Sequence, residues 1–516
     1  MGGAAQAPGG PIARRRSGRK GAARLTMRGR PSYELTDLMS VNGNEHDPPN
    51  AIMSEAAAQR LDVLVVGGGS AGLCAAIAAR RGGASVRLVE QAPASLRGGN
   101  TRHARNFRLM HERPQWYVPD AYDEDTFFED LVRVTAGATD EALARRLIRG
   151  SAGIAAWLGD NGVRLQDPAG GAMPYSRRTA FFLGGGKAMI NALYATAARL
   201  GVAIGYDSDV VALRFADDRD CEADIAHHGN IERVTAKTMV LCSGGHQADL
   251  DWLRRDFGAA AGNFMVRGSP YVTGRVLRLL LDAGIRPVGD PARCHLVAVD
   301  ARGPKFDGGI VTRITAIPQG IVVDRDGRRF HDEGEEARKT HYAQWGARIA
   351  DRPDQVAYLV LDAAGLGRAP PTALPPIRAD TIAGLAASLG LDPAALQATL
   401  RDYNAATDAA DDRPPRERGT AGLAPAKSRG ALPLTVPPFA AYPMRPGITF
   451  THFGVAVDDH MRVLGSDGRP VRHVFAAGMI MAANVLGCGY LAGLGVALST
   501  VFGRLAGEEA ARHAGT

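Results

Sequence analysis

An α/β fold with a parallel sheet is predicted by consecutive segments that begin near residue 60. Leu61–Val66 is a short apolar run of the kind that forms a buried parallel strand. Gly-Gly-Gly-Ser-Ala-Gly follows over 67–72, and Leu73–Arg81 is rich in alanine, as helices are. Ala84–Val89 is a second apolar run and leads directly into Glu90. Strand, glycine turn, helix, strand and acid in this order are typical of a Rossmann-like dinucleotide-binding unit.

Each residue of the glycine turn has a physical role in this interpretation. Gly67 permits a tight turn, and Gly69 lets the backbone approach a pyrophosphate closely. Gly72 allows the helix to pack closely on the strand, and the helix N-terminus faces the phosphates. Glu90 lies 18 residues after Gly72, where its carboxylate can accept from ribose hydroxyls. The predicted dinucleotide contacts of this unit are Gly67, Gly69, Ser70, Ala71, Gly72 and Glu90.

Composition and charge exclude several classes of protein. Of the 516 residues, 45% are hydrophobic and 22% are charged, which excludes a mostly disordered or collagen-like chain. The net charge of +7 raises nucleic acid as a partner, but the charge is unevenly spread. Residues 1–30 hold eight basic residues and no acid, whereas 31–52 hold four acids and no base. The first 52 residues therefore carry +4 of the +7, and we expect no nucleic-acid partner.

The N-terminal residues predict an extension outside the fold. Residues 1–52 are rich in Gly, Ala, Pro and Arg without an apolar period, which predicts disorder. No apolar segment follows the basic cluster at 14–20, so we expect no export signal. Met53 opens the stretch that leads into the first strand and is an alternative start of translation under this interpretation.

Cysteine usage and one uncharged stretch bear on metals and location. The five cysteines, Cys74, Cys221, Cys242, Cys294 and Cys488, have no paired spacing, so we expect no disulfide framework, iron–sulfur cluster or metal site. Val474–Gly503 is uncharged over 30 residues, which is long enough to cross a bilayer. Its six glycines and the lack of a flanking basic cluster favour a buried strand, glycine loop and helix instead. We expect a cytoplasmic protein.

Four later motifs resemble flavoproteins of the fumarate reductase and succinate dehydrogenase group. They are GGNT at 98–101, GGGK at 184–187, TMVLCSGG at 238–245 and VFAAG at 474–478. The resemblance implies FAD as the cofactor, and no second fingerprint for a nicotinamide dinucleotide accompanies it. It also implies that the glycine-rich run 486–495 and the following helix point backbone dipoles at the flavin. The further residues implied to bind FAD are Gly98, Gly99, Asn100, Thr101, Gly244, Gly478 and Leu491.

Five segments narrow the resemblance to the FAD-dependent tricarballylate dehydrogenases. They are GGNTRHARNFR at 98–108, NFMVRGSPYVTG at 263–274, KFDGGIVTR at 305–313, RRFHDEG at 328–334 and NVLGCGYLAG at 484–493. The implied reaction removes two hydrogens from adjacent carbons of a small polycarboxylate, as in tricarballylate to aconitate. Arginine suits such a substrate because its planar fork binds carboxylates bidentately.

The same resemblance implies a domain order. Residues 53–288 and 448–516 are expected to form the FAD-binding domain in two parts. Residues 289–447 are expected to form an inserted α+β capping domain that closes over the flavin and excludes water.

Four catalytic residues follow from the resemblance. His295 occupies the place of a substrate-binding histidine in a strand that leads into the cap. Arg313 lies close in sequence to the expected flavin-facing edge of the cap. Arg338 has the spacing of the arginine that shuttles the proton in fumarate reductases, with His341 as the alternative. His452 lies near the substrate histidine of the group. Each of them could also have a purely structural role.

The chain departs from the group at three positions. Val485 stands where fumarate reductases carry a substrate-clamping arginine, which weakens a fumarate or succinate interpretation. Met479 stands where an acid usually contacts the flavin side chain. His103 is offset from the histidine that carries covalent flavin in some relatives, so we expect FAD to be bound non-covalently.

A fumarate reductase-like enzyme stays open as an alternative to the tricarballylate dehydrogenase, and two further alternatives lie outside these carboxylate enzymes. One is a flavoprotein subunit that relays electrons without its own small-molecule substrate. The other is a dehydrogenase of a bulkier substrate such as a ketosteroid, which the arginine-rich loops disfavour and a tyrosine-lined pocket would favour. The resemblance also implies a membrane-bound iron–sulfur or haem redox partner, which would place the protein at the periphery of the inner membrane.

Overall fold

The computed structural model describes residues 60–168, 177–216, 219–337, 344–407 and 412–515. These residues lie within one compact unit that spans Ala57–Thr516. The predicted N-terminal extension, residues 1–52, lies outside the described residues.

The sheet at the glycine turn has the strand order β16-β17-β9-β1-β2-β6. β1 (Leu61–Val66) runs parallel to β2 (Val86–Val89) on one side and to β9 (Asn230–Leu241) on the other. β2 pairs in parallel with β6 (Ala203–Gly205), and β9 pairs in parallel with β17 (Pro470–Ala476). The α/β fold class is thus confirmed. Parallel pairing brings the carboxyl ends of β1, β2 and β9 to one edge, where open α/β sheets bind ligands.

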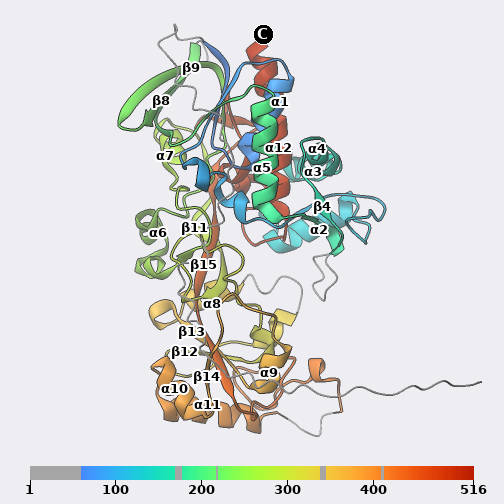
Figure 1. The fold of residues 1–516 in the computed structure, drawn as a ribbon, viewed down its shortest axis with the longest axis vertical. Helices are drawn as coiled ribbons and strands as arrows, with labels where there is room; N and C mark the ends of the chain where they lie inside the picture. The colour runs from blue at the N-terminus through green and yellow to red at the C-terminus, as the bar shows by residue number, and fades with distance from the viewer. Residues whose placement is uncertain (1–59, 169–176, 217–218, 338–343, 408–411, 516) are drawn as a thin grey trace, which may run out of the picture. The chain divides into compact units, whose positions relative to one another are not determined.

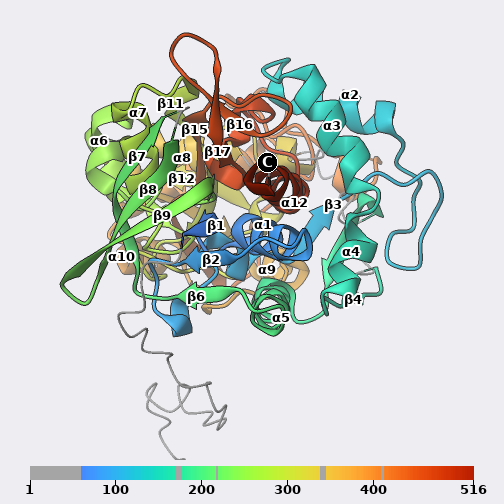
Figure 2. The same ribbon diagram turned by 90° about the horizontal axis from the view of Figure 1, so that it is seen from above.

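The helix after the glycine turn is held by the last helix of the fold. α1 (Ser70–Arg81) packs against α12 (Leu494–Gly515) and α5 (Gly185–Arg199), and the three lie side by side in both views (Figure 1, Figure 2). A Cβ at Gly503 would overlap the backbone of Ala71, and a Cβ at Gly507 would overlap that of Ala75. These glycines let the two helix backbones approach closely, so the start of α1 depends on α12.

A second sheet forms the cap and is organised around one long strand. β15 (Phe439–Val455) pairs antiparallel with β11 (Pro287–Asp300) and with β13 (Ala357–Leu361). It also pairs with β10 (Met265–Val266) in parallel and with β14 (Ile377–Ala379). The predicted domain boundaries at 288/289 and 447/448 fall inside β11 and β15, so two paired strands run across them.

The other elements complete these two sheets and their surroundings. The remaining helices are α2 (Glu124–Thr135), α3 (Glu141–Ser151), α4 (Ile154–Asp160), α6 (Leu250–Phe257), α7 (Arg275–Asp282), α8 (Trp345–Ala350), α9 (Ala363–Arg368), α10 (Ile382–Leu389) and α11 (Pro393–Ala405). The remaining strands are β3 (Asn106–Arg108), β4 (Leu165–Gln166), β5 (Thr179–Phe182), β7 (Asp209–Ala216), β8 (Arg219–His227), β12 (Ile321–Asp324) and β16 (Arg462–Leu464).

The uncharged stretch Val474–Gly503 is divided among several short elements. It contains the end of β17, two single 3-10 turns, a glycine-rich loop and the first turns of α12. Nowhere in the described part of the chain is a helix both long and apolar enough to cross a membrane.

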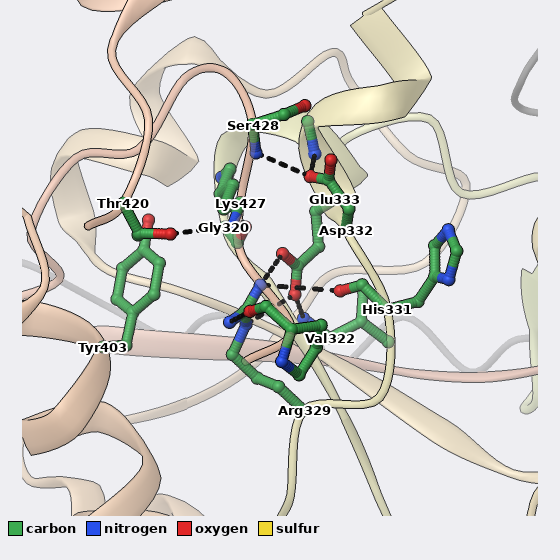
Figure 3. A network of polar contacts seen from close by, with 12 residues as sticks. Gly320, Val322, Arg329, His331, Asp332, Glu333, Tyr403, Thr420, Lys427 and Ser428 are labelled. Atoms are coloured by element: carbon green, nitrogen blue, oxygen red, sulfur yellow. Dashed lines mark hydrogen bonds and ion pairs between the residues drawn. The ribbon is translucent and has the colours of Figure 1, made fainter. Parts of the chain in front are cut away.

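A buried polar network lies at the turn after β12 (Figure 3). Glu333 accepts from Arg329 through both carboxylate oxygens, at 3.0 and 2.6 Å, and from the Val322 amide at 2.8 Å. The Lys427 ammonium donates to the carbonyls of Pro318 and Gly320 at 2.9 and 2.7 Å. Burial lowers the pKa of Lys427 to about 8. The network therefore holds a cation that loses its proton more easily than an exposed lysine does.

Replacing Lys427 tests this network through the pH dependence of stability. Above pH 8 the folded protein releases the Lys427 proton, while the unfolded chain keeps it until about pH 10.4. The unfolded state then binds more protons, so the free energy of unfolding should rise between pH 8 and 10 relative to K427M. The rise is limited to about 1.4 kcal/mol per pH unit, the value for one proton. Chemical denaturation across this pH range measures it.

The control for this comparison is K187M, which removes an exposed amine from α5. Relative to wild type, K187M should show no change in the pH dependence. Parallel curves for wild type and K427M would contradict the assignment of a buried, easily deprotonated Lys427.

Candidate functional site

A cavity of about 870 Å³ opens at the carboxyl edge of the parallel sheet. Its wall begins at the turn after β1, continues past the ends of β2 and β9, and reaches the start of α7. Of the predicted cofactor residues, Gly67, Gly69, Ser70, Ala71, Glu90, Gly99, Asn100, Thr101 and Gly244 line it. Gly72, Gly98, Gly478 and Leu491 do not. The structure thus brings most of the predicted set to one cavity from four separate parts of the sequence.

The glycine turn shows which positions need space for a ligand and which need space for the fold. Gly67 has a φ of 105°, and a Cβ there would lie 2.6 Å from the Cys242 carbonyl oxygen. A Cβ at Gly72 would overlap the carbonyl oxygen of Gly67. At Gly69 the nearest protein atom to a Cβ would be 3.7 Å away, which is an ordinary contact distance, so a Cβ would overlap no protein atom. Gly69 therefore faces the cavity, whereas Gly72 permits the packing of α1 on β1.

Glu90 organises the turn from the end of β2. Its carboxylate accepts from the Gly68 amide at 2.9 Å and from the Ala92 amide at 2.8 Å. Burial raises the pKa of this carboxyl, and the backbone N–H groups partly oppose that effect. The Glu90 carboxylate thus fixes the backbone of the glycine turn and of the segment after β2.

Asn100 connects the glycine-rich loop to the cap strand. Its amide nitrogen donates to the Thr449 carbonyl of β15 at 2.6 Å, and its amide oxygen accepts from the Ser269 amide at 2.9 Å. Next to it, the Thr101 hydroxyl lies 2.9 Å from the Ser70 hydroxyl at the start of α1. The loop is thereby fixed between the first helix and β15.

Sequence reasoning missed several residues of this cavity. Asp209 follows β6, whose carboxyl end faces the same edge, and that position was the available signal. Ser269 and Tyr271 lie inside the motif at 263–274. The sequence singled out that segment but did not show that these two residues line the cavity. Gln247, Arg275, Met479 and Ser499 also line the cavity.

Unsatisfied polar atoms around Gly245 fit a bound polar cofactor. The Ser243 hydroxyl, the Gln247 amide oxygen and the Thr451 hydroxyl are buried and have no hydrogen-bond partner within the described protein. Buried polar groups are rarely left unpaired. Ser243 and Gln247 line the cavity, so a ligand with several hydrogen-bonding groups, as a flavin dinucleotide has, suits these residues.

A second, open cavity of about 1700 Å³ contains two of the predicted catalytic residues. His295 of β11 and His452 of β15 both line it, together with Tyr490 of the C-terminal glycine-rich loop. The His295 ring stacks on Tyr490 with 4.0 Å between centroids and lies 5.3 Å from the Phe450 ring. The register of the sheet places His295 directly opposite Phe450, which explains this contact.

Both histidines are held neutral at physiological pH. Burial lowers the pKa of His295 well below its usual range, and the nearby charges of Arg267 and Arg313 lower it further. Burial also lowers the pKa of His452. His452 Nδ1 lies 2.9 Å from the Leu486 carbonyl oxygen. Because a carbonyl only accepts, Nδ1 carries the proton and Nε2 is left as an acceptor.

A group of charged residues lies beside His295. Arg267 is buried and donates to the Thr449 hydroxyl at 2.7 Å and to the Gly309 carbonyl at 3.3 Å. Asp307 lies 2.5 Å from His103 Nε2 and 3.6 Å from the Arg102 guanidinium. The Gly309 amide donates to the Arg267 carbonyl, so the loop that holds Asp307 wraps around Arg267.

The family model for an FAD binding domain matches residues 62–496. The chain belongs to this family. It is 28% identical over 493 residues to a probable fumarate reductase of Shewanella frigidimarina, covering 92% of this chain and 78% of that protein. It is also 28% identical to an NADH:fumarate oxidoreductase of Klebsiella pneumoniae, where the match covers 89% of this chain but only 48% of the relative.

A solved structure shows the same relationship in three dimensions. The open conformation of a flavocytochrome c3 fumarate reductase superposes with a TM-score of 0.71 at 26% identity, over 89% of this chain and 79% of that one. The protein is therefore an FAD-dependent oxidoreductase of the fumarate reductase and succinate dehydrogenase flavoprotein group. The expectations of FAD as cofactor and of an enzyme acting on carbon–carbon bonds are confirmed.

The other predicted positions have mixed outcomes. Arg338 and the alternative His341 lie outside the described residues, so their role stays a prediction. Val485 is fully buried, and Met479 lines the first cavity.

All five cysteines are free, and the described residues contain no group of three or more side chains suited to a metal ion. Arg313 bridges to Val299 of β11 beside the charged group.

The contrast between Gly69 and Gly72 gives a test of the first cavity. In G69A the methyl group meets protein atoms only at ordinary contact distances, so apoprotein stability should change little, while FAD affinity should fall about 10- to 100-fold. In G72A the methyl group meets the Gly67 carbonyl, so the melting temperature of the apoprotein should fall. Thermal unfolding and flavin fluorescence titration measure the two effects. Unchanged FAD affinity in G69A would show that the pyrophosphate lies elsewhere.

Proposed function

We propose that the protein removes two hydrogens from adjacent carbons of a small polycarboxylate, with tricarballylate to aconitate as the preferred reaction. The observation that carries the proposal is the second cavity, where two neutral buried histidines adjoin a group of guanidinium charges. Carboxylates are bound by arginine forks and by histidine N–H donors. The segments shared with tricarballylate dehydrogenases support the choice of substrate over other carboxylates.

In this proposal each residue has a separate role. Arg313 binds a substrate carboxylate, and neutral His295, held against Tyr490, donates a hydrogen bond to the same end of the substrate. His452 Nε2 takes the proton from the carbon next to the one that loses hydride, because its Nδ1 proton is held by Leu486. FAD, when bound, supplies the acceptor for the hydride. The electron pair of the C–H bond that loses its proton forms the new double bond, while the other C–H pair leaves with the hydride.

The reverse direction is supported equally by the relatives. Two proteins with similar sequences are described as fumarate reductases by name, and the same residues would serve the addition of hydrogen to an enedioate. A second substrate class is favoured by one observation: Tyr490, Phe257, Phe264 and Leu296 line the second cavity beside the histidines. This apolar wall would suit a ring such as that of a 3-ketosteroid.

We further propose that a separate redox protein exchanges electrons with the flavin, as the sequence implied. A membrane-bound iron–sulfur or haem protein would place this chain at the inner membrane surface. The dependence of this chain on a redox partner can be tested with membranes from the native host. These membranes should reoxidise the reduced flavin faster than buffer alone does.

Anaerobic flavin titration tests the proposed reaction. Tricarballylate added to the oxidised holoprotein should bleach the absorbance near 450 nm with about one equivalent per flavin. Fumarate or aconitate added to the photoreduced protein should restore the absorbance if the reverse direction operates. A 3-ketosteroid should leave the spectrum unchanged. The proposal fails if no tricarboxylate or dicarboxylate changes the flavin redox state in either direction.

Replacement of His452 tests the assignment of the proton acceptor. H452Q keeps a donor for the Leu486 carbonyl but removes the basic nitrogen, so kcat should fall about 100- to 10,000-fold. FAD content and substrate-induced spectral shifts should persist. Rapid-reaction measurement of flavin reduction gives the rate. A rate close to wild type would transfer the role to the Arg338 and His341 segment.

A further inference from the structure

The charged group beside His295 combines guanidiniums from three separate parts of the fold. Arg102 ends the glycine-rich FAD loop, Arg267 follows β10, and Arg313 lies in the loop after β11. Backbone pairing brings them together: the Arg267 amide donates to the Ile448 carbonyl of β15 at 3.0 Å, and Arg313 bridges to Val299 of β11. β11 and β15 are themselves paired. The group is therefore positioned by the backbone and not by flexible surface loops alone.

The guanidiniums of this group place positive charge at His295. Burial lowers the pKa of His295, and the charges of Arg267 and Arg313 lower it further. At His103 burial lowers the pKa, and Asp307, in direct contact with the ring, opposes the smaller effects of Arg102 and Arg267. Asp300, a buried acid of this region, is bound by Arg302 at 2.6 Å. The region around His295 is therefore electrostatically suited to an anion.

The group is shielded but still reachable by water. The side chains of Arg102, His103 and Asp307 are 16%, 22% and 28% exposed, whereas Arg267 is 9% exposed. Guanidinium–carboxylate bonds gain strength when they are partly removed from water. Ser269 next to Arg267 lines the first cavity, and His295 lines the second. Arg267 itself lines neither cavity, but it is two residues from Ser269 in the chain and its charge acts on His295 in the second cavity.

We propose that Arg267, assisted by Arg102, binds a second carboxylate of the substrate and so selects for polycarboxylates over monocarboxylates. This inference rests on the proposed function for the first carboxylate, which was assigned to Arg313 and His295. Arg267 supplies a cation from a different segment than Val485, where the expected clamping arginine is absent. A substrate with two or three carboxylates could then contact Arg313 and Arg267 at once.

Binding of citrate to the holoprotein tests this role without turnover. Citrate has three carboxylates, and a hydroxyl replaces the central hydrogen, so the central C–H bond of tricarballylate is missing. Isothermal titration and the flavin difference spectrum should show wild-type binding that R267Q weakens about 10- to 100-fold. Succinate binding should weaken less. R267K should give an intermediate affinity, because lysine keeps the charge and loses the planar fork.

The matched control is R416Q, which removes an arginine whose side chain is 84% exposed in the cap. It should bind citrate as wild type does. FAD content and melting temperature identify a variant that has not folded, and if R267Q fails to fold, R102Q decides the question with the same readout. Citrate affinity that is unchanged in R267Q or, in that case, R102Q overturns the proposal.

The outcomes separate this inference from the proposed function. Citrate binding that depends on Arg267, without bleaching by tricarballylate, would keep the polycarboxylate site and reject the proposed substrate. Bleaching by tricarballylate with an unchanged KM in R267Q would keep the reaction and reject the role of Arg267. Wild-type protein that binds no polycarboxylate would overturn both.

Discussion

The pairing of β15 with β11 is the constraint on which the candidate site depends. Together these strands connect the second sheet to the residues around the first cavity, and they pair from Pro287–Val455 to Asp300–Met444 with register shifts between Gly289 and Cys294 and between His295 and Leu296. That register puts His295 opposite Phe450 and brings the Thr449 carbonyl to Asn100 of the glycine-rich loop. A shift of the register by one residue would turn His295 and His452 to the other face of the sheet. The site geometry is thus a property of backbone hydrogen bonding before it is one of individual side chains.

Burial and charge act together on the histidines. A histidine that is removed from water favours its neutral form, and neighbouring guanidiniums add to that preference. The result is an arrangement in which the arginines keep their charge and the imidazoles serve as uncharged donors or acceptors. Because the Leu486 carbonyl fixes one nitrogen of His452, the protonation of the other is set by the fold. Acid–base chemistry and anion binding are therefore assigned to different residue types.

The sequence predicted the parts of the fold that depend on local chemistry. The turn at 67–72 was recognisable because glycine is required there for reasons that concern only nearby atoms. The capping domain was expected from motifs and not from its own periodicity, and it stays a prediction. Arg267 and Gln247 were not chosen as site residues, because their positions result from pairings between segments far apart in the sequence. Arg267 lies inside the motif at 263–274, and this motif is the one feature of the sequence that pointed to it.

The packing of α1 against α12 has a consequence for how the protein is made. Gly503 and Gly507 bring the last helix against Ala71 and Ala75, and β17 completes the sheet beside β9. During synthesis the glycine turn emerges early, but the surfaces that support it are translated near the end of the described chain. The cofactor site can therefore close only after most of the polypeptide has emerged, with the cap between its halves already made. Loading of the flavin should follow synthesis, and the unpaired edge of β9 is an aggregation risk that chaperones would need to cover until then.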